Sequence, residues 1–308
     1  MGWPAAERAD PDPDRSGRDQ GNLNLPPRLL ARIERALGPE RALIAILDYD
    51  GTLTPIVASP SAARLAPAVR ATLATLAAQP RVGLAILSGR ALVDIRRRVG
   101  VRRVVYGGCH GLEIAGAGLS FRHPAARRAR VAAARRLLAA AVRGIPGARL
   151  EWKGLAVSLH YRRVAPSRVG EVRRAAARVA RRAPDLSLIA GRKVFDFVPR
   201  VGWDKGAAAR WIARRLGAAL PGRATVLYVG DDTTDEAAFK ALRRCAVTVR
   251  VGAVPTTAEH VVRGVHEVHA LLRAIVRMLD ARERGVTLSK PRHRVVAALR
   301  RPSGPPAS

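Results

Sequence analysis

The segment that most constrains this fold reads Leu47-Asp48-Tyr49-Asp50-Gly51-Thr52-Leu53-Thr54-Pro55 and follows an apolar run over residues 42–47. An apolar run of this length that ends in a turn-rich loop predicts a buried strand. Asp48 and Asp50 then lie at the carboxyl end of the strand, and side chains two residues apart on an extended segment point to the same side. Crowded carboxylates repel each other unless a positive group lies between them, which a hard cation such as Mg²⁺ provides. The alternative is that the two aspartates only form a turn, and for an isolated pair this is the commoner case.

Further apolar segments predict a parallel α/β sheet around this strand. The other expected strands cover residues 82–87, 104–106, 225–229 and 247–251. The expected helices cover residues 29–37, 67–78 and 266–282, with one more that begins at Lys205 and one that carries Phe239 and Leu242. Ligands of such a sheet bind outside the carboxyl ends of the strands, which is where the paired aspartates, Ser88 and Asp231 fall.

Two segments near those strand ends suit phosphate binding. Ser88-Gly89-Arg90 follows a predicted strand, and a hydroxyl at a strand end before a glycine and a helix start suits phosphate binding. The string SGR alone is common and carries little specificity. Lys205 stands in the first turn of its helix, where a cation opposes the helix dipole, so its presence there indicates a function. Asp235 and Glu236 alone could be ordinary acidic residues of a helix start.

The pattern changes between residues 114 and 199, where a helix followed by a hairpin occurs twice. The expected helices cover residues 127–142 and 167–182, and the expected strands cover residues 150–153, 156–162, 186–190 and 193–198. Two helices and four strands predict a small α+β layer inserted between the halves of the parallel sheet.

These segments together resemble the haloacid dehalogenase (HAD) phosphohydrolase superfamily. The resemblance rests on DYDGTLTP at 48–55, SGR at 88–90, Lys205 at a helix start, and GDDTTDE at 230–236. Other segments resemble the trehalose-6-phosphate phosphatase family, with Cys109 where that family usually has Asn or Ser and Asp196 where it usually has Glu. They are GGCHGLE at 107–113, WKG at 152–154 with HYR at 160–162, and GRKVFD at 191–196. The resemblance spans roughly residues 40–280 and implies a HAD-like Rossmannoid core with helices on both faces and an inserted α+β cap.

The resemblance implies roles for individual residues. Asp48 would be the covalent nucleophile and Asp50 the general acid and base, with Ser88 and Lys205 binding the phosphoryl oxygens. Mg²⁺ would be held at Asp48, the Asp50 backbone carbonyl, Asp231 and Asp232, with Asp235 supporting the metal site. The implied substrate-binding positions are Thr52, Gly89, Arg90, His110, Glu113, Lys153, His160, Arg162, Asp196 and Asp235.

The function implied by the resemblance is Mg²⁺-dependent hydrolysis of trehalose 6-phosphate through an aspartyl-phosphate. A related HAD phosphatase acting on sucrose 6-phosphate or a glycosyl-phosphoglycerate is an alternative, because the four superfamily motifs are common to all of them. A catalytically silent basic binding protein is another alternative, which predicts a lost nucleophile or acid, and both are intact here.

The net charge is +31, from 55 basic and 24 acidic residues. Such a charge can indicate nucleic-acid binding, but the arginines are spread over most predicted helices and stacking aromatic residues are scarce. We therefore expect no specific nucleic-acid partner, and a field that attracts a phosphorylated substrate. With no apolar run of membrane-spanning length and two distant cysteines, a monomeric cytoplasmic protein without membrane contacts is expected.

The chain is expected to divide into five parts. Residues 1–27 form a disordered arm, 28–113 the first part of the core, 114–199 the cap, 200–284 the second part of the core, and 285–308 a flexible basic tail.

Overall fold

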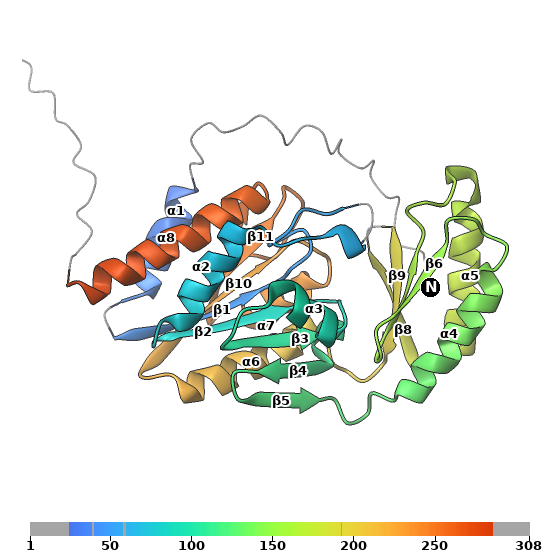
Figure 1. Cartoon of the computed structure of the whole chain (residues 1–308), viewed down its shortest axis with the longest axis horizontal. Helices are drawn as coiled ribbons and strands as arrows, with labels where there is room; N and C mark the ends of the chain where they lie inside the picture. Colours follow the sequence, from blue (N-terminus) through green and yellow to red (C-terminus); the bar gives the residue numbers. More distant parts are fainter. Residues whose placement is uncertain (1–24, 39, 58–59, 192, 286–308) are drawn as a thin grey trace, which may run out of the picture.

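The computed structural model describes residues 25–285 except 39, 58–59 and 192 (Figure 1). Most of the predicted arm at 1–27 and nearly all of the predicted tail at 285–308 lie outside these described residues. The last residues of the predicted arm belong to the folded part, because Leu25 is buried in the core and α1 (Pro27–Ala36) begins at Pro27.

The main sheet has eight strands in the order β12-β11-β10-β1-β2-β3-β4-β5. The six strands from β12 to β3 are parallel, and β4 and β5 continue the sheet in antiparallel pairs. β1 lies between β10 and β2, so Leu47 pairs with both Val229 and Ile86. The strands are β1 (Arg41–Leu47), β2 (Val82–Leu87), β3 (Val104–Gly108), β4 (Glu113–Gly116), β5 (Leu119–Arg122), β10 (Arg223–Gly230), β11 (Ala246–Val251) and β12 (His260–Val262).

Helices cover both faces of the main sheet, and Figure 1 shows α2 and α8 on one side with α6 on the other. The side chains of β1 alternate between the two layers. Leu43, Ala45 and Leu47 pack in the cluster beneath α1, α2 (Pro67–Ala78), α3 (Leu92–Val99) and α8 (Val265–Glu283). Ile44 and Ile46 pack against α6 (Lys205–Ala219) and α7 (Asp235–Leu242). β1 is buried on both faces, which explains why its sequence is a continuous apolar run rather than an alternating one.

A smaller module, which we define as α4, α5 and β6–β9, stands beside the main sheet (Figure 1). Its four strands form an antiparallel sheet in the order β6-β7-β9-β8. The helices pack on one face of that sheet through a separate hydrophobic cluster, so the module has its own core. Its elements are α4 (Arg128–Val142), β6 (Arg149–Trp152), β7 (Val157–His160), α5 (Val169–Arg182), β8 (Leu186–Gly191) and β9 (Val194–Pro199).

The structure confirms the predicted α/β class with a mostly parallel sheet. It differs from the sequence interpretation at residues 113–122, because the β4–β5 hairpin pairs with β3 and extends the main sheet. Part of the chain expected in the cap from residue 114 onward therefore lies in the main sheet, and the division of the chain into core and cap remains a prediction. Each of these strands has only four residues, too few for a clear periodicity, and they form by pairing, β4 with β3 and β5 with β4. In the part of the chain that the structure describes, no helix combines the length and the hydropathy that crossing a bilayer requires.

Candidate active site

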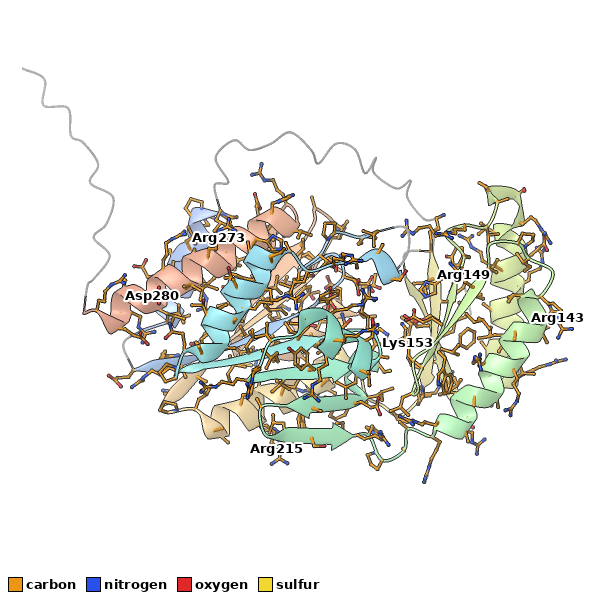
Figure 2. All side chains as sticks on the ribbon, in the orientation of Figure 1. Arg143, Arg149, Lys153, Arg215, Arg273 and Asp280 are labelled. Carbon is orange, nitrogen blue, oxygen red and sulfur yellow. The ribbon has the colours of Figure 1, made fainter. Side chains whose placement is uncertain are left out.

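A cleft of about 490 Å³ lies between the carboxyl ends of the central strands and the smaller module. Asp48, Ser88 and Asp231 line it from the ends of β1, β2 and β10, and Lys153, His160 and Asp196 line it from the smaller module. In Figure 2, Lys153 lies between the two sheets, whereas Arg143 lies on the outer side of the module, beside the helices. The parallel sheet therefore presents its strand ends to the same space as the open face of the smaller sheet, as expected for a ligand site.

Asp48 is a buried carboxylate with a cation beside it. The residue is 4% exposed, and its Oδ1 accepts a hydrogen bond from Lys205 Nζ at 2.8 Å. Lys205 Nζ also donates to Asp235 Oδ1 at 2.8 Å, so one ammonium group bridges two carboxylates. Burial would lower the pKa of Lys205, but Asp235 and Asp48 outweigh that effect and raise it. Lys205 is therefore held as a cation at the first turn of α6, which accounts for its place at an unfavourable end of the helix dipole.

Three carboxylates crowd around this point. Oxygen atoms of Asp48, Asp231 and Asp235 lie within 4.8 Å of one another. Burial raises the pKa of Asp48 to about 7, with an opposing effect from Lys205 and a further rise from Asp235. Burial and the neighbouring carboxylates raise the pKa of Asp231 well above its ordinary value. One lysine does not compensate three clustered carboxylates, so the site favours an additional positive charge.

The donor set fits a hard divalent cation. All three groups are carboxylates, the ligand type that Mg²⁺ and Ca²⁺ prefer. Gly51 brings the turn after β1 against this cluster, because it has φ +86° and a Cβ there would lie 2.1 Å from Asp231 Oδ2. Thr52, which is fully buried, donates to Asp231 Oδ1 at 3.3 Å. The turn predicted from sequence thus also positions a carboxylate from a distant strand.

Asp235 lies beneath the cleft rather than on its surface, where the predicted substrate contact would require it. Its side chain is fully buried, and its Oδ1 accepts from Tyr228 OH at 2.7 Å as well as from Lys205. Its Oδ2 accepts from the Asp232 amide at 2.9 Å. Asp235 is enclosed by protein donors and belongs to the acidic cluster, whereas the Asp232 carboxylate accepts from the hydroxyls of Thr233 and Thr234.

Asp50 faces the cleft and is engaged by Arg90. Arg90 Nε and Nη2 donate to the two oxygens of Asp50, each at 2.6 Å. Arg90 lines the cleft and contacts Asp50, and the substrate contact that the sequence predicts for it stays a prediction. Ser88 is 1% exposed, and its Oγ accepts from the Arg90 amide at 3.2 Å.

His110 approaches the cleft from the turn after β3. It lies close enough to Gly89 that a Cβ on that glycine would come within 2.8 Å of His110 Cε1. Both ring nitrogens are buried, and neither has a hydrogen-bond partner among the described residues. Nε2 lies 3.6 Å from Asp196 Oδ2, so this ring is a polar group available to a ligand.

The wall contributed by the smaller module carries a buried ion pair. Lys153 Nζ donates to Asp196 Oδ1 at 3.2 Å, and the hydroxyl of Ser158 donates to the same carboxylate oxygen. Burial would raise the pKa of Asp196, but Lys153 and the donors around Asp196 hold it well below its usual range. Burial would lower the pKa of Lys153, and Asp196 and Glu151 outweigh that effect. Both groups stay charged and face the cleft.

Sequence interpretation missed Glu151 on the same wall. Its Oε2 lies 2.8 Å from His160 Nε2, and both residues line the cleft. Burial would raise the pKa of Glu151, and the hydrogen bond with His160 and the charge of Lys153 lower it instead. Residues 149, 151 and 153 alternate along β6 and its extension, so the period of two that locates Lys153 also points to Glu151 and Arg149.

The predicted site residues divide into two groups. Those that line the cleft are Asp48, Asp50, Ser88, Gly89, Arg90, His110, Lys153, His160, Arg162, Asp196, Lys205, Asp231 and Asp232. Thr52 and Asp235 lie beneath it, as described above. Glu113 is 8% exposed, and its carboxylate accepts from Arg122 Nε at 2.9 Å and lies 3.7 Å from Arg128. Glu113 is therefore not among the residues that line the cleft in this structure, and the sugar contact expected for it stays a prediction.

The fold and the site together define a class of protein. A parallel α/β sheet whose central strand ends in paired aspartates, with a lysine and further carboxylates gathered at the same point, is the arrangement of a haloacid dehalogenase-type phosphohydrolase.

Comparison with known proteins identifies the family within this class. A family model described as trehalose-phosphatase matches residues 46–273, and the chain belongs to that family. A trehalose-phosphate phosphatase from Mycobacterium avium is 42% identical over 199 residues, which cover 64% of this chain and 50% of the relative. A probable trehalose-phosphate phosphatase from rice, Oryza sativa subsp. japonica, is 32% identical over 256 residues, which cover 79% of this chain and 69% of the relative.

A solved structure has the same fold. The C-terminal domain of trehalose-6-phosphate phosphatase from Candida albicans matches with a TM-score of 0.69 at 23% identity, covering 82% of this chain and 97% of that one. The chain spans between 17% and 50% of the length of several curated relatives that it matches.

Proposed function

We propose that this chain is a Mg²⁺-dependent phosphomonoesterase that hydrolyses trehalose 6-phosphate to trehalose and phosphate through an aspartyl-phosphate. The observation that carries the proposal is the buried Asp48 carboxylate, hydrogen-bonded to Lys205 at the base of a cleft whose opposite wall is polar and charged. Family membership supports the choice of reaction and substrate.

Asp48 and Asp231 would hold the metal, and Asp235, whose oxygens already accept from Lys205, Tyr228 and the Asp232 amide, would support the site with its negative charge. The Asp50 backbone carbonyl is a further ligand suggested by the superfamily motif. When bound, Mg²⁺ offsets the charge that otherwise keeps an anionic nucleophile away from an anionic ester. Lys205 would place a second positive charge beside the phosphoryl group. The Ser88 hydroxyl would donate a hydrogen bond to a phosphoryl oxygen.

In the first step, an oxygen of Asp48 forms a bond to phosphorus while the bond between phosphorus and the sugar oxygen breaks. The electron pair of the broken bond stays on the sugar oxygen, which takes a proton from Asp50. In the second step, a water oxygen attacks phosphorus and its proton returns to Asp50. As the bond between the water oxygen and phosphorus forms, the bond between phosphorus and Asp48 breaks, which releases phosphate, restores the Asp48 carboxylate and leaves Asp50 protonated as it was before the first step.

The smaller module would select the sugar. The strand ends supply contacts to phosphate and metal, so discrimination between sugars depends on the wall formed by Lys153 and Asp196, together with His110 from the turn after β3. A charged group on this wall that is left unpaired by the wrong sugar costs about 1–3 kcal/mol. Several such losses would reject a monosaccharide phosphate.

The test compares kcat/KM for trehalose 6-phosphate, sucrose 6-phosphate and glucose 6-phosphate. We expect trehalose 6-phosphate to be preferred over glucose 6-phosphate by at least about 100-fold, the size of about two lost interactions. Lys153→Ala should reduce this preference more than it reduces turnover of an aryl phosphate. Lys240→Ala, which removes an exposed lysine of α7, is the matched control and should behave as wild type.

Three results would contradict the proposal in different ways. Turnover by Asp48→Asn at the wild-type rate would exclude the covalent mechanism, because the amide keeps the shape of the side chain and loses the nucleophile. Equal kcat/KM for the three sugars would leave a phosphatase and remove the trehalose assignment. Preference for sucrose 6-phosphate would favour the related sugar-phosphate phosphatase.

A further inference from the structure

The buried guanidinium group of Arg90 forms a bidentate salt bridge with Asp50. Its Nε and Nη2 donate to the two oxygens of the Asp50 carboxylate, each at 2.6 Å, in a side-on bidentate pair that fixes the plane of the carboxylate. The Arg90 side chain is 6% exposed, whereas that of Asp50 is 39% exposed. Arg90 therefore holds Asp50 from the protein side and leaves it partly open toward the cleft.

Arg90 is itself held by groups that do not belong to the reaction. Its Nη1 donates to Asp94 Oδ2 at 2.9 Å, and its guanidinium carbon lies 5.4 Å from the centre of the Tyr49 ring. Arg98 Nε donates to the same Asp94 oxygen at 2.7 Å, and Arg98 Nη1 donates to the Ala63 carbonyl at 2.7 Å. Burial would raise the pKa of Asp94, and the hydrogen bonds from Arg98 and Arg90 hold it below its usual value. A row of alternating charges thus connects Asp50 to the loop before α2.

We propose that Arg90 is a positioning residue that sets the orientation of Asp50 for proton transfer to the leaving oxygen, and that Asp94 fixes Arg90 in that role. This inference rests on the proposed function, in which Asp50 is the general acid. It replaces the direct substrate contact that the sequence suggested for Arg90.

The geometry favours positioning over phosphate binding. All three guanidinium nitrogens of Arg90 already donate to carboxylates, two to Asp50 and one to Asp94. These contacts use three of the five guanidinium N–H groups and fix the guanidinium plane against the Asp50 carboxylate. Asp50, rather than Arg90, is the more exposed of the two groups.

The two roles predict different dependence on the leaving group. A sugar oxygen needs a proton from Asp50 as its bond to phosphorus breaks, whereas p-nitrophenolate leaves as a stable anion. If Asp50 is no longer held in the right orientation, hydrolysis of the sugar ester should therefore slow more than hydrolysis of the aryl ester. Loss of a phosphate contact, or a general loosening of the site, should slow both esters alike, since both carry the same phosphoryl group.

The experiment measures kcat/KM for trehalose 6-phosphate and p-nitrophenyl phosphate with Mg²⁺ on the full chain. Arg90→Lys keeps the charge and loses the bidentate pair, and it should lower kcat/KM for the sugar ester by about 100-fold and for the aryl ester by less than about 5-fold. Asp94→Asn should lower the ratio of kcat/KM for the sugar ester to kcat/KM for the aryl ester by about 10-fold. Arg96→Lys, on the exposed side of α3, is the matched control and should leave the ratio unchanged.

An equal fall for both esters, or no fall for either, would overturn the inference. A thermal unfolding curve of each variant separates misfolding from a selective loss. If the wild type hydrolyses p-nitrophenyl phosphate but not trehalose 6-phosphate, the substrate proposal fails. The same ratio measured with glycerol phosphate as the alkyl ester then still decides the role of Arg90.

Discussion

Gly51→Ala should damage the metal site through a single methyl group. Gly51 has φ +86°, a conformation in which an L-residue is strained. The new Cβ would lie 2.1 Å from Asp231 Oδ2 and 2.4 Å from Asp231 Cγ, where normal Cβ contacts are not found below 3.0 Å. Asp231 must therefore retreat by about 1 Å, which exceeds the roughly 0.5 Å within which a functional constellation works.

Gly51→Ala should cause two losses, one of folding stability and one of Mg²⁺ binding and activity. Left-handed backbone strain costs about 1–2 kcal/mol, which corresponds to a fall in Tm of about 2–8 °C. Displacement of a carboxylate from the acidic cluster should weaken Mg²⁺ binding by at least about 10-fold, because changes in groups around metal ligands alone have effects of that size. A misplacement of about 1 Å should lower kcat/KM by about 100-fold.

Gly118→Ala separates these two losses. Gly118 has φ +78°, and a Cβ there would meet no atom within 4 Å. It should lose similar stability to Gly51→Ala while retaining activity and metal dependence. The assays are thermal unfolding in EDTA and phosphate release as a function of Mg²⁺ concentration.

A Gly51→Ala variant with the wild-type Mg²⁺ requirement and kcat/KM would show that a Cβ at this position does not displace Asp231. Equal loss of activity in both alanine variants would also contradict the displacement of Asp231, because backbone strain alone would then explain the effect.

Two further predictions concern buried groups. Lys205→Met should lower the free energy of unfolding by about 3–5 kcal/mol in urea, because it leaves buried carboxylates without their cation. A loss of about 0–1 kcal/mol, as for an exposed ion pair, would contradict this. Burial raises the pKa of Cys109 to about 12, whereas Cys245 is exposed. A thiol reagent should therefore modify only Cys245 in the folded chain and both cysteines in denaturant, and reaction of both in the folded chain would contradict the buried position of Cys109.

The sequence by itself determined the strands of the core and the edge at which the site lies. Apolar runs that end in polar residues predict β1, β2 and β10, and the predicted ranges 67–78 and 82–87 coincide with α2 and β2. Because parallel strands end at one edge of the sheet, the sequence also places Asp48, Ser88 and Asp231 near one another. These inferences succeed because burial on both faces and a polar strand end are properties of a short segment.

Only the tertiary structure decided which groups pair across the site. Asp235 begins α7 like an ordinary acidic residue of a helix start, yet the fold buries it against Lys205, 30 residues away. Arg90 belongs to a segment that suits phosphate binding, yet its guanidinium donates to Asp50, 40 residues away. Glu113 fits a family motif, yet its carboxylate is bound by Arg122 of the hairpin that extends the main sheet. Local patterns specify the direction of a side chain along its own element, whereas the charges it meets depend on how distant elements pack, because a buried charge takes whichever opposite charge the fold brings within reach.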